Sequence, residues 1–569
     1  MSATGDNRPE HFETVVIGSG FGGSVMTYRL AAANRSVCLL ERGKPYPPGS
    51  FPRTPRAMAT NLWDPGSGLF GMFDVWAFRG LEALVSSGLG GGSLIYANVL
   101  LRKDPKWFVD EVLPDGSYER WPISYDDLEP HYGEVENMLD AQRYPFELTP
   151  YSLTPKTRAM QEAAAAMNRE WILPNLAVSF ASPGEDPIPG APLTEKAENL
   201  HRRPRRTCRL CGECDIGCND GAKNTLDLTY LSRAVDSGAV IRTLCEVRRL
   251  ARQDGGRGYI VTYRDHGSGA DGEPGEEVSI TADRVVLAAG TLGSTYLLLR
   301  NRSSFPHLSR ALGTRFSGNG DLLTFLRRSR KDGQPRVLDP EYGPVITSAI
   351  RVPDKADGEL ANGALGRSGR GFYVEDGGNP QFLDWLVELS GASSTAGRAA
   401  AFALRRAVAH LVGRPRSHLS GDFAKLLGDG ATSGSALPML AMGRDIPDGV
   451  MRLRDGDLEI NWTTKSSSAF FDDVEKTVHG IAEHLGARLM NSPLWLFKHV
   501  ITVHPLGGCP MGATEHLGVV NQWGEVFNYP GLYVVDGSAM PGPVGPNPSL
   551  TIAAFANRAA DGILAGVPR

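Results

Sequence analysis

Short apolar runs bounded by glycine or polar residues recur along this chain. Three of them, His11–Ile17, Ser36–Leu40 and Asp283–Gly290, have the length and the nearly continuous apolar character of strands buried on both faces of a parallel sheet. A fourth run, Gly531–Asp536, ends in an acidic residue. The segment Ser24–Ala33, between the first two runs, is predicted to be a helix. Buried strands followed by helices predict an α/β fold with a doubly wound sheet.

A glycine-rich turn follows the first predicted strand directly. The segment Gly18–Gly23 (GSGFGG) matches the G-x-G-x-x-G pattern. In this pattern Gly18 allows a tight turn, Gly20 lets the backbone approach a pyrophosphate, and Gly23 lets the next helix pack closely. The amides at the start of that helix favour phosphate groups. Glu41 ends the second predicted strand, where a carboxylate can bind ribose hydroxyls, so the pattern predicts a dinucleotide site.

Two further segments are expected to lie against the same nucleotide. Gly88–Ser93 (GLGGGS) precedes an apolar segment that looks ordered. Glycine permits backbone contact with a ligand where any Cβ would collide, although a flexible surface loop is the alternative interpretation. Thr291–Ser294 begins a helix after the strand Asp283–Gly290, which again places helix amides beside a cofactor.

The candidate chemistry lies near the end of the sequence. His504 opens the segment HPLGGCPMG, and Asn547 lies in GPNPSLTI. An alcohol that gives a hydride to a flavin also loses its hydroxyl proton, and an imidazole is a suitable acceptor for that proton. A carboxamide can donate to the developing oxyanion or to the flavin without titrating. The alternatives are a histidine buried in the core and an Asn-Pro turn.

Four cysteines are concentrated in one short block. Cys208, Cys211, Cys214 and Cys218 give C-x2-C-x2-C-x3-C, which is the ligand spacing of bacterial ferredoxins. The proline that follows the fourth cysteine in ferredoxins is replaced here by Asn219. Three interpretations stay open: an iron–sulfur cluster, a zinc site, and thiols without metal that contribute to packing.

Composition excludes several classes of protein. The chain has 569 residues, 41% hydrophobic residues, 22% charged residues and a net charge of −5. The charge gives no reason to expect a nucleic-acid partner, and no apolar run reaches the length of a membrane span. The first residues show no signal peptide, and seven cysteines without one predict a cytoplasmic location rather than a disulfide framework.

Taken together, these segments resemble the glucose–methanol–choline (GMC) family of FAD-dependent oxidoreductases. The motifs GSGFGG, GLGGGS, VVLAAGTLGS, Asn461-Trp462, HPLGGC and DGS…NPSLTI occur in the family order over nearly the whole chain. Within the family the chain is most similar to the bacterial cholesterol (3β-hydroxysteroid) oxidase branch. The resemblance implies FAD as cofactor, His504 and Asn547 as catalytic residues, and a hydrophobic alcohol as substrate.

The same resemblance implies a third catalytic residue and a larger flavin site. Glu375, in GFYVEDGGNP, lies roughly where that branch has a carboxylate that acts as a base over the steroid; the alternative is a surface acid in a turn. The branch has an asparagine at the position of Tyr96, and here Asn98 follows two residues later. The predicted flavin site consists of Gly18, Gly20, Phe21, Gly22, Gly23, Glu41, Gly88, Gly91, Gly92, Ser93, Asn98, Val247, Gly290, Asp536, Gly537 and Asn547.

Two domains are expected. Residues 8–46, 225–320 and 518–569 are predicted to form a doubly wound FAD domain. Residues 47–224 and 321–517, which include the cysteine block and His504, are predicted to form an interleaved α+β substrate domain. Within the second domain, Ala396–Val412 has the periodicity of an amphipathic helix. It is either an ordinary packed helix or a lid that touches a lipid surface transiently.

Two classes of function remain. The first is an alcohol oxidoreductase that acts on a bulky hydrophobic alcohol and passes electrons to oxygen or to an external acceptor. The second is a flavoprotein whose main task is electron relay through a cluster bound by the cysteines.

Overall fold

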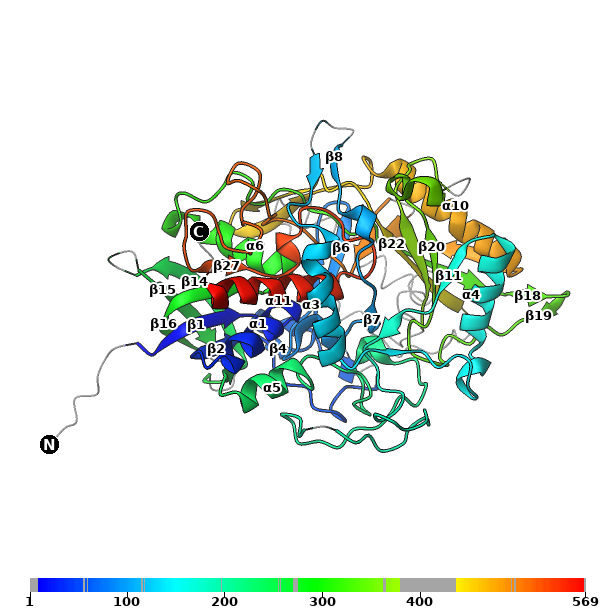
Figure 1. Cartoon of the computed structure of the whole chain (residues 1–569), viewed down its shortest axis with the longest axis horizontal. Helices are drawn as coiled ribbons and strands as arrows, with labels where there is room; N and C mark the ends of the chain where they lie inside the picture. The colour runs from blue at the N-terminus through cyan, green and yellow to red at the C-terminus, as the bar shows by residue number, and fades with distance from the viewer. Residues whose placement is uncertain are drawn as a thin grey trace.

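The computed structural model describes residues 9–566 apart from 55–56, 59, 114–115, 117, 196, 254, 256, 270–274, 362–364, 379–435, 493 and 496–497. Within these limits the chain builds two large sheets from different parts of the sequence, with helices packed against them (Figure 1). The expected helix Ala396–Val412 lies outside the described residues.

The first sheet has seven strands. Strands β1, β2, β13, β27 and the second half of β16 are parallel, while β14, β15 and the first half of β16 are antiparallel. The nearly complete burial of β1 and β2 agrees with the continuous apolar runs. This sheet confirms the predicted α/β fold class. Its order is β13 (Val240–Arg242), β2 (Val37–Leu40), β1 (His11–Ile17), β16 (Glu276–Leu287), β15 (Tyr259–Asp265) and β14 (Cys245–Arg252), with β27 (Leu532–Val534) also paired to β16.

Two elements differ from the sequence prediction by more than two residues at a boundary. Strand β16 has 12 residues instead of the short run expected from Asp283, because β15 supports its first half and β1 and β27 support its second half. Helix α1 (Phe21–Ala32) begins before the predicted Ser24. Gly20 is its N-cap, so the last glycines of the turn already belong to the helix.

The two ends of the chain share one layer of helices. Helix α11 (Ser549–Ala565) packs against α1 and against α3 (Tyr125–Met138), and α5 (Tyr230–Asp236) packs on the other side of α1 (Figure 1). A hydrogen bond of 3.0 Å between the hydroxyls of Tyr132 and Thr551 joins α3 to α11. The C-terminal segment is therefore held beside the N-terminal glycine turn.

The second sheet has six strands and is antiparallel throughout. Helix α10 (Ser468–His484) buries an apolar face that includes Phe470, Val474 and Ile481 in the core of this region. Helix α4 (Pro155–Ala166) contacts β20, β21 and α10. The strand order is β11 (Glu170–Ile172), β20 (Ala349–Val352), β21 (Phe372–Asp376), β22 (Ala436–Gly443), β17 (Leu322–Arg327) and β25 (Arg488–Asn491).

Smaller sheets complete the structure. In a three-stranded sheet β6 lies between β26 and β5, and β26 ends two residues before His504. Its strands are β26 (Val500–Thr502), β6 (Leu81–Ser86) and β5 (Phe73–Ala77). A second three-stranded sheet has the order β10 (Gln142–Arg143), β12 (Asn175–Leu176) and β7 (Val99–Leu100). The remaining strands form two-stranded sheets: β3 (Trp63–Asp64) with β4 (Leu69–Phe70), β8 (Asp110–Val112) with β9 (Tyr118–Arg120), β18 (Arg330–Lys331) with β19 (Gln334–Pro335), and β23 (Val450–Arg454) with β24 (Asp457–Asn461).

The two large sheets draw on the segments that the sequence assigns to two domains. All seven strands of the first sheet come from the predicted FAD domain, and all six strands of the second come from the predicted substrate domain. The exact domain boundaries stay a prediction.

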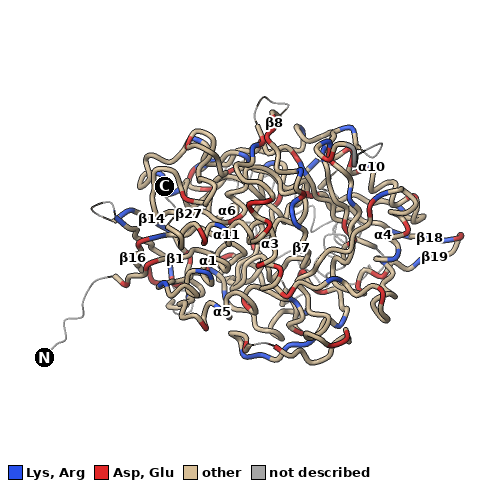
Figure 2. The backbone as a smooth tube through the Cα atoms, in the orientation of Figure 1, with Lys and Arg blue, Asp and Glu red and all other residues tan. Residues whose placement is uncertain are grey.

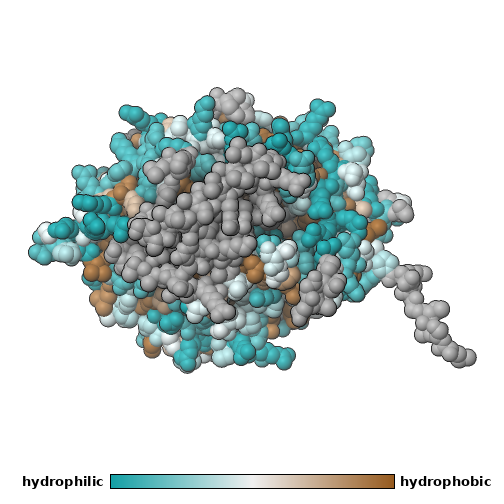
Figure 3. Space-filling view, turned by 180° about the vertical axis from the view of Figure 1, so that it is seen from behind, coloured by the Kyte–Doolittle hydropathy of each residue, from teal (hydrophilic) through white to brown (hydrophobic). Residues whose placement is uncertain are grey.

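The surface carries both signs of charge. In the described part of the chain, basic and acidic residues alternate over the molecule (Figure 2). The face opposite to that of Figure 1 shows mainly hydrophilic side chains around the grey atoms (Figure 3). None of the helices among the described residues is long and apolar enough to span a bilayer.

A buried ionic network ties the β8–β9 hairpin to the end of β22. The guanidinium of Arg444, which has no exposed surface, pairs with Asp354 at 2.8 Å, Glu111 at 2.7 Å and Glu119 at 3.1 Å. Arg370 pairs with Glu111 and Glu119 as well. Because Asp354 and Glu119 are themselves fully buried, each needs a cation to offset the loss of hydration.

We expect Arg444→Leu to lower the free energy of unfolding by about 3–5 kcal/mol, because the substitution leaves buried carboxylates uncompensated. Chemical denaturation of the purified protein measures this effect. Arg454→Leu, which removes an exposed arginine paired with Glu459, should change stability little. Equal stability of the two variants would contradict the assigned role of the network.

Candidate active site

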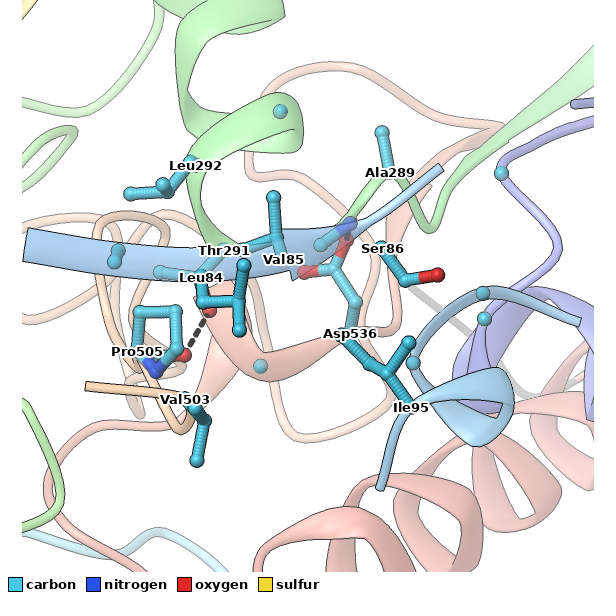
Figure 4. A pocket seen from close by; sticks show the side chains of 18 of the residues that line it. Leu84, Val85, Ser86, Ile95, Ala289, Thr291, Leu292, Val503, Pro505 and Asp536 are labelled. Carbon is cyan, nitrogen blue, oxygen red and sulfur yellow. Dashed lines mark hydrogen bonds between the residues drawn. The ribbon is translucent and has the colours of Figure 1, made fainter. Parts of the chain in front are cut away.

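A large cavity of about 680 Å³ is lined by residues from both large sheets. This volume is typical of cofactor and small-molecule sites. Figure 4 shows Leu84 and Val85 of β6 on one wall, with Leu292 of α6 (Gly290–Arg300) and Val503 beside the same space. The side chains named here are apolar, so the cavity favours an occupant with substantial hydrophobic surface.

The predicted glycine turn lines one end of this cavity. A Cβ at Gly18 would lie 2.4 Å from the carbonyl oxygen of Ala288, and its φ of +96° also favours glycine. At Gly20, by contrast, the nearest protein atom to a Cβ would be 4.0 Å away, so the space in front of this residue is open. No side chain caps the N-terminus of α1. An open backbone next to uncapped amides fits the pyrophosphate of a dinucleotide.

Glu41 reaches the same end of the cavity. Its Oε2 accepts hydrogen bonds from the backbone N and the hydroxyl of Ser19, and its Oε1 accepts one from Gly43 N at 2.8 Å. Each carboxylate oxygen can accept more than one hydrogen bond. The residue lines the cavity. It is therefore fixed in orientation while it keeps acceptor capacity for a ribose hydroxyl.

Asp536 joins the middle of the chain to its C-terminal part. Its carboxylate accepts hydrogen bonds from Gly290 N and Ser538 N, each at 2.9 Å, and from the hydroxyl of Ser294. Burial raises the pKa of Asp536 above its usual value, although these hydrogen bonds oppose the rise. Asp536 and Gly537 both line the cavity, and their contact with the cofactor stays a prediction.

His504 is oriented by a carboxylate that the sequence analysis did not identify. Its Nδ1 lies 2.8 Å from Oδ1 of Asp321, whose Oδ2 accepts from the hydroxyl of Thr502 and from the backbone N of Val503 at 2.9 Å each. A carboxylate only accepts hydrogen bonds, so Nδ1 carries the hydrogen and Nε2 is left as the acceptor. His504 also lines the cavity, so it can take a proton from a ligand there.

Asn547 lines the same cavity on a loop that is held from both sides. The amide of Asn319 binds Gly545 through its backbone N at 2.9 Å and its carbonyl at 3.3 Å. The ammonium of Lys103 donates to the carbonyls of Pro543 and Val544. These contacts fix the backbone just before Asn547.

Glu375 lies behind Asn547 rather than on the cavity wall. It is fully buried, and its Oε2 accepts from Nδ2 of Asn547 at 3.3 Å. In the described residues neither its Oε1 nor Oδ1 of Asn547 has a partner. Burial, together with the carboxylates of Asp376 and Asp321, raises the pKa of Glu375 to about 8, although the Asn547 hydrogen bond lowers it. The surface-turn alternative is wrong, because the residue is in the interior strand β21.

Twelve of the predicted flavin-site residues line the cavity, and four do not: Gly23, Gly88, Ser93 and Asn98. A Cβ at Gly23 would lie 1.9 Å from Gly18 O, so this glycine serves the packing of α1. The hydroxyl of Ser93 donates a hydrogen bond to Gly90 O in the same loop and accepts one from Leu226 N. The amide of Asn98 is fully buried, and both of its polar atoms lack a partner among the described residues.

The four cysteines of the block line a second cavity, of only about 20 Å³. That volume holds about one water molecule. No group of three or more His, Cys, Asp or Glu side chains among the described residues is placed to hold a metal ion. Burial raises the pKa of Cys208 and Cys214, and that of Cys211 to about 12. The predicted iron–sulfur cluster therefore gains no support from this geometry, which favours thiols that contribute to packing.

Comparison with known proteins shows which family is similar to this chain. Two family models, both described as GMC oxidoreductase, match residues 188–317 and 472–556. A cholesterol oxidase of Mycobacterium tuberculosis is 30% identical over 96% of this chain and 90% of its own length. A long-chain-alcohol oxidase of Arabidopsis thaliana is 24% identical, over 95% of this chain and 65% of its own length.

A solved structure shares the fold. The crystal structure of pyridoxine 4-oxidase from Mesorbium loti matches with a TM-score of 0.57 and 18% identity, over 97% of this chain and 99% of that one.

The small volume between the thiols leads to a measurable expectation for metal content. We expect anaerobically purified protein, after reconstitution with iron and sulfide, to hold less than about one iron per chain. Cys211→Ser should leave turnover with one-electron dyes unchanged. Iron and acid-labile sulfide at or above one atom per chain, lost in Cys211→Ser together with dye turnover, would restore the interpretation of an electron-relay cluster.

Proposed function

Because the chain belongs to the GMC oxidoreductase family, we propose that it oxidises the hydroxyl of a bulky hydrophobic alcohol with FAD as the hydride acceptor. One observation carries this proposal: the oriented imidazole of His504 and the amide of Asn547 line the same cavity as the glycine turn that fits a dinucleotide. An enzyme that oxidises an alcohol in this way needs its proton acceptor and its cofactor site in one cavity. Here residues from the end of the sequence supply the first, and residues from the start supply the second.

The residues present fit the cofactor. The open backbone of Gly20, the uncapped start of α1 and the carboxylate of Glu41 would hold the pyrophosphate and ribose. Helix α11 begins beside Asn547 and also has no side-chain cap. When bound, FAD supplies the acceptor for the hydride that leaves the carbinol carbon.

The protein's own groups manage the proton. Nε2 of His504 accepts the hydroxyl proton, and Asp321 stabilises the resulting imidazolium through Nδ1. The amide of Asn547 stabilises negative charge on the alcohol oxygen as the proton departs. Glu375 acts through Asn547 as a positioning residue, because it has no place on the cavity wall.

The apolar walls and the named relatives support a hydrophobic substrate of the sterol or long-chain type, and the oxidases among those relatives support oxygen as the electron acceptor. Anaerobic mixing of the purified protein with sterols and long-chain alcohols tests the proposal directly. Bleaching of the flavin by at least one alcohol, followed by recovery of its absorbance on admission of air, is expected. An oxidised flavin that none of these alcohols reduces would refute it.

We expect His504→Ala to slow flavin reduction at saturating alcohol by roughly 10²–10⁴-fold, with FAD still bound, because the proton acceptor is lost and the nucleotide turn is untouched. Asp321→Asn should slow the same step, since an amide no longer enforces the tautomer of His504. Stopped-flow absorbance measures both rates. His484→Ala, at the exposed end of α10, is the control, and native rates in the two site variants would exclude this base.

The pKa of Glu375, about 8, leads to a pH-dependent prediction. Because burial raises this pKa, the carboxyl is neutral below about pH 8 and becomes charged above it. A buried negative charge next to Asn547 opposes hydride transfer, because the hydride brings further negative charge to the flavin. We expect the flavin-reduction rate of the native protein to fall as the pH rises through about 8, and Glu375→Gln to abolish that fall. Identical pH profiles would show that Glu375 does not influence the reaction.

A further inference from the structure

The cysteine block places one of its own acidic residues in the wall of the large cavity. Asp215 lies in the short 3-10 helix Cys214–Ile216 and lines the cavity together with Tyr96, Val345 and His504. Its Oδ1 is buried and has no hydrogen-bond partner among the described residues. An unpaired buried carboxylate oxygen is costly, so it marks a place where a ligand can supply the missing donor.

Two buried lysines lie near this carboxyl but do not bind it. The ammonium of Lys223 donates to the carbonyls of Leu94, Tyr96 and Cys214, at 2.7–3.1 Å. The ammonium of Lys156 donates to the carbonyls of Pro344 and Val345 at 2.6 Å each and to Gly377 O at 3.5 Å. An ammonium has three hydrogens. Both lysines have therefore committed their donors to the backbone, and Asp215 keeps its acceptor capacity.

The local charge restricts what can bind. Burial raises the pKa of Asp215 to about 6, and the charges of Lys223, Lys156 and His504 oppose this rise. The two ammonium groups disfavour a cationic ligand, and they have no free hydrogens to offer to an anionic one. A neutral group that donates a hydrogen bond, such as a hydroxyl, satisfies Oδ1 without adding charge.

The rest of the block holds Asp215 in place. Gly212 N donates to Gly343 O at 2.9 Å and Gly343 N donates to Leu210 O at 3.1 Å, so the block is attached to the segment that continues to Val345. Lys223 ties Cys214 O to the loop that ends in Tyr96. The thiols of the block line a small cavity together with Gly212, Gly343 and Lys223.

We propose that Asp215 is a second recognition site in the cavity, which accepts a hydrogen bond from a further hydroxyl of the substrate, away from the hydroxyl that is oxidised. This inference rests on the proposed alcohol oxidation and deepens it: the substrate class becomes a hydrophobic alcohol with two hydroxyls. Because Asp215 and His504 have fixed places in the wall, only one separation of the two hydroxyls fits.

The test uses matched pairs of alcohols with the native holoprotein. Each pair consists of a 3-hydroxysteroid and the same skeleton with one added hydroxyl, or of an n-alkanol and the α,ω-diol of equal length. A hydrogen bond to a charged group contributes about 1.5–3 kcal/mol, which corresponds to a roughly 10–100-fold change. We expect kcat/KM for one diol to exceed that of its partner by about this factor, with the difference mainly in KM.

Variants locate the effect. Asp215→Asn should reduce the diol-to-mono-ol ratio of kcat/KM by about 10–100-fold. Asp220→Asn, which removes an acid of the same segment paired with Arg209, should keep the native ratio. If Asp215→Asn does not fold, the ratio in the native protein still decides, since it needs no variant.

Three outcomes overturn the inference. The first is equal kcat/KM within every pair in the native protein. The second is an unchanged ratio in a folded Asp215→Asn. The third is an equal loss for both members of each pair together with a shifted absorbance spectrum of the bound flavin, which would assign Asp215 to the cofactor. Failure of every alcohol to reduce the flavin would instead refute the proposed function, and the inference would fall with it.

Discussion

The structure depends on close contacts between three backbone segments. Only glycine can occupy the contact positions, because any side chain would collide with the neighbouring backbone. The turn after β1 touches the end of β16, where a Cβ at Gly18 would lie 2.4 Å from Ala288 O. The start of α1 touches the end of β27, where a Cβ at Gly22 would lie 2.1 Å from Val535 O. These contacts join the start, the middle and the end of the chain. Because β27 leads into Asp536 and then to Asn547, the same contacts bring the candidate catalytic amide to the nucleotide turn.

The buried carboxyl groups of the site differ in how many donors they receive. The carboxylate of Asp321 accepts from His504, Thr502 and backbone N–H groups, which together stabilise its charge. Glu375 receives one hydrogen bond of 3.3 Å from Asn547, which lowers its pKa, but burial outweighs this effect and raises the pKa to about 8. The two acids therefore have different roles: Asp321 orients the imidazole of His504 through the hydrogen bonds that it accepts, while Glu375 is a neutral group near pH 7.

The sequence predicted most clearly those features that depend on local backbone geometry. A strand, a glycine turn and a helix in succession leave few alternatives, and β1, the turn and α1 follow that prediction closely. Residues whose role depends on distant partners were not predictable in this way. Asp321 has no motif of its own, because it is defined by contacts to residues 502–504, about 180 positions later in the sequence. Asn98 was predicted from its position in a loop, but it is completely buried, with a φ of +70°, and is not among the residues that line the cavity.

The cysteine block shows why a ligand pattern alone does not assign a metal. Spacing fixes which thiols can come together, and here all four do line one small cavity. Occupancy depends on the volume between them and on the direction of each Sγ, which the surrounding backbone sets. That backbone is held against residues 343–345 and beneath Lys223, and these contacts also direct Asp215 into the larger cavity. A motif that suggests redox chemistry by its spacing thus has its clearest physical consequence in the polarity of the large cavity, whose wall includes Asp215.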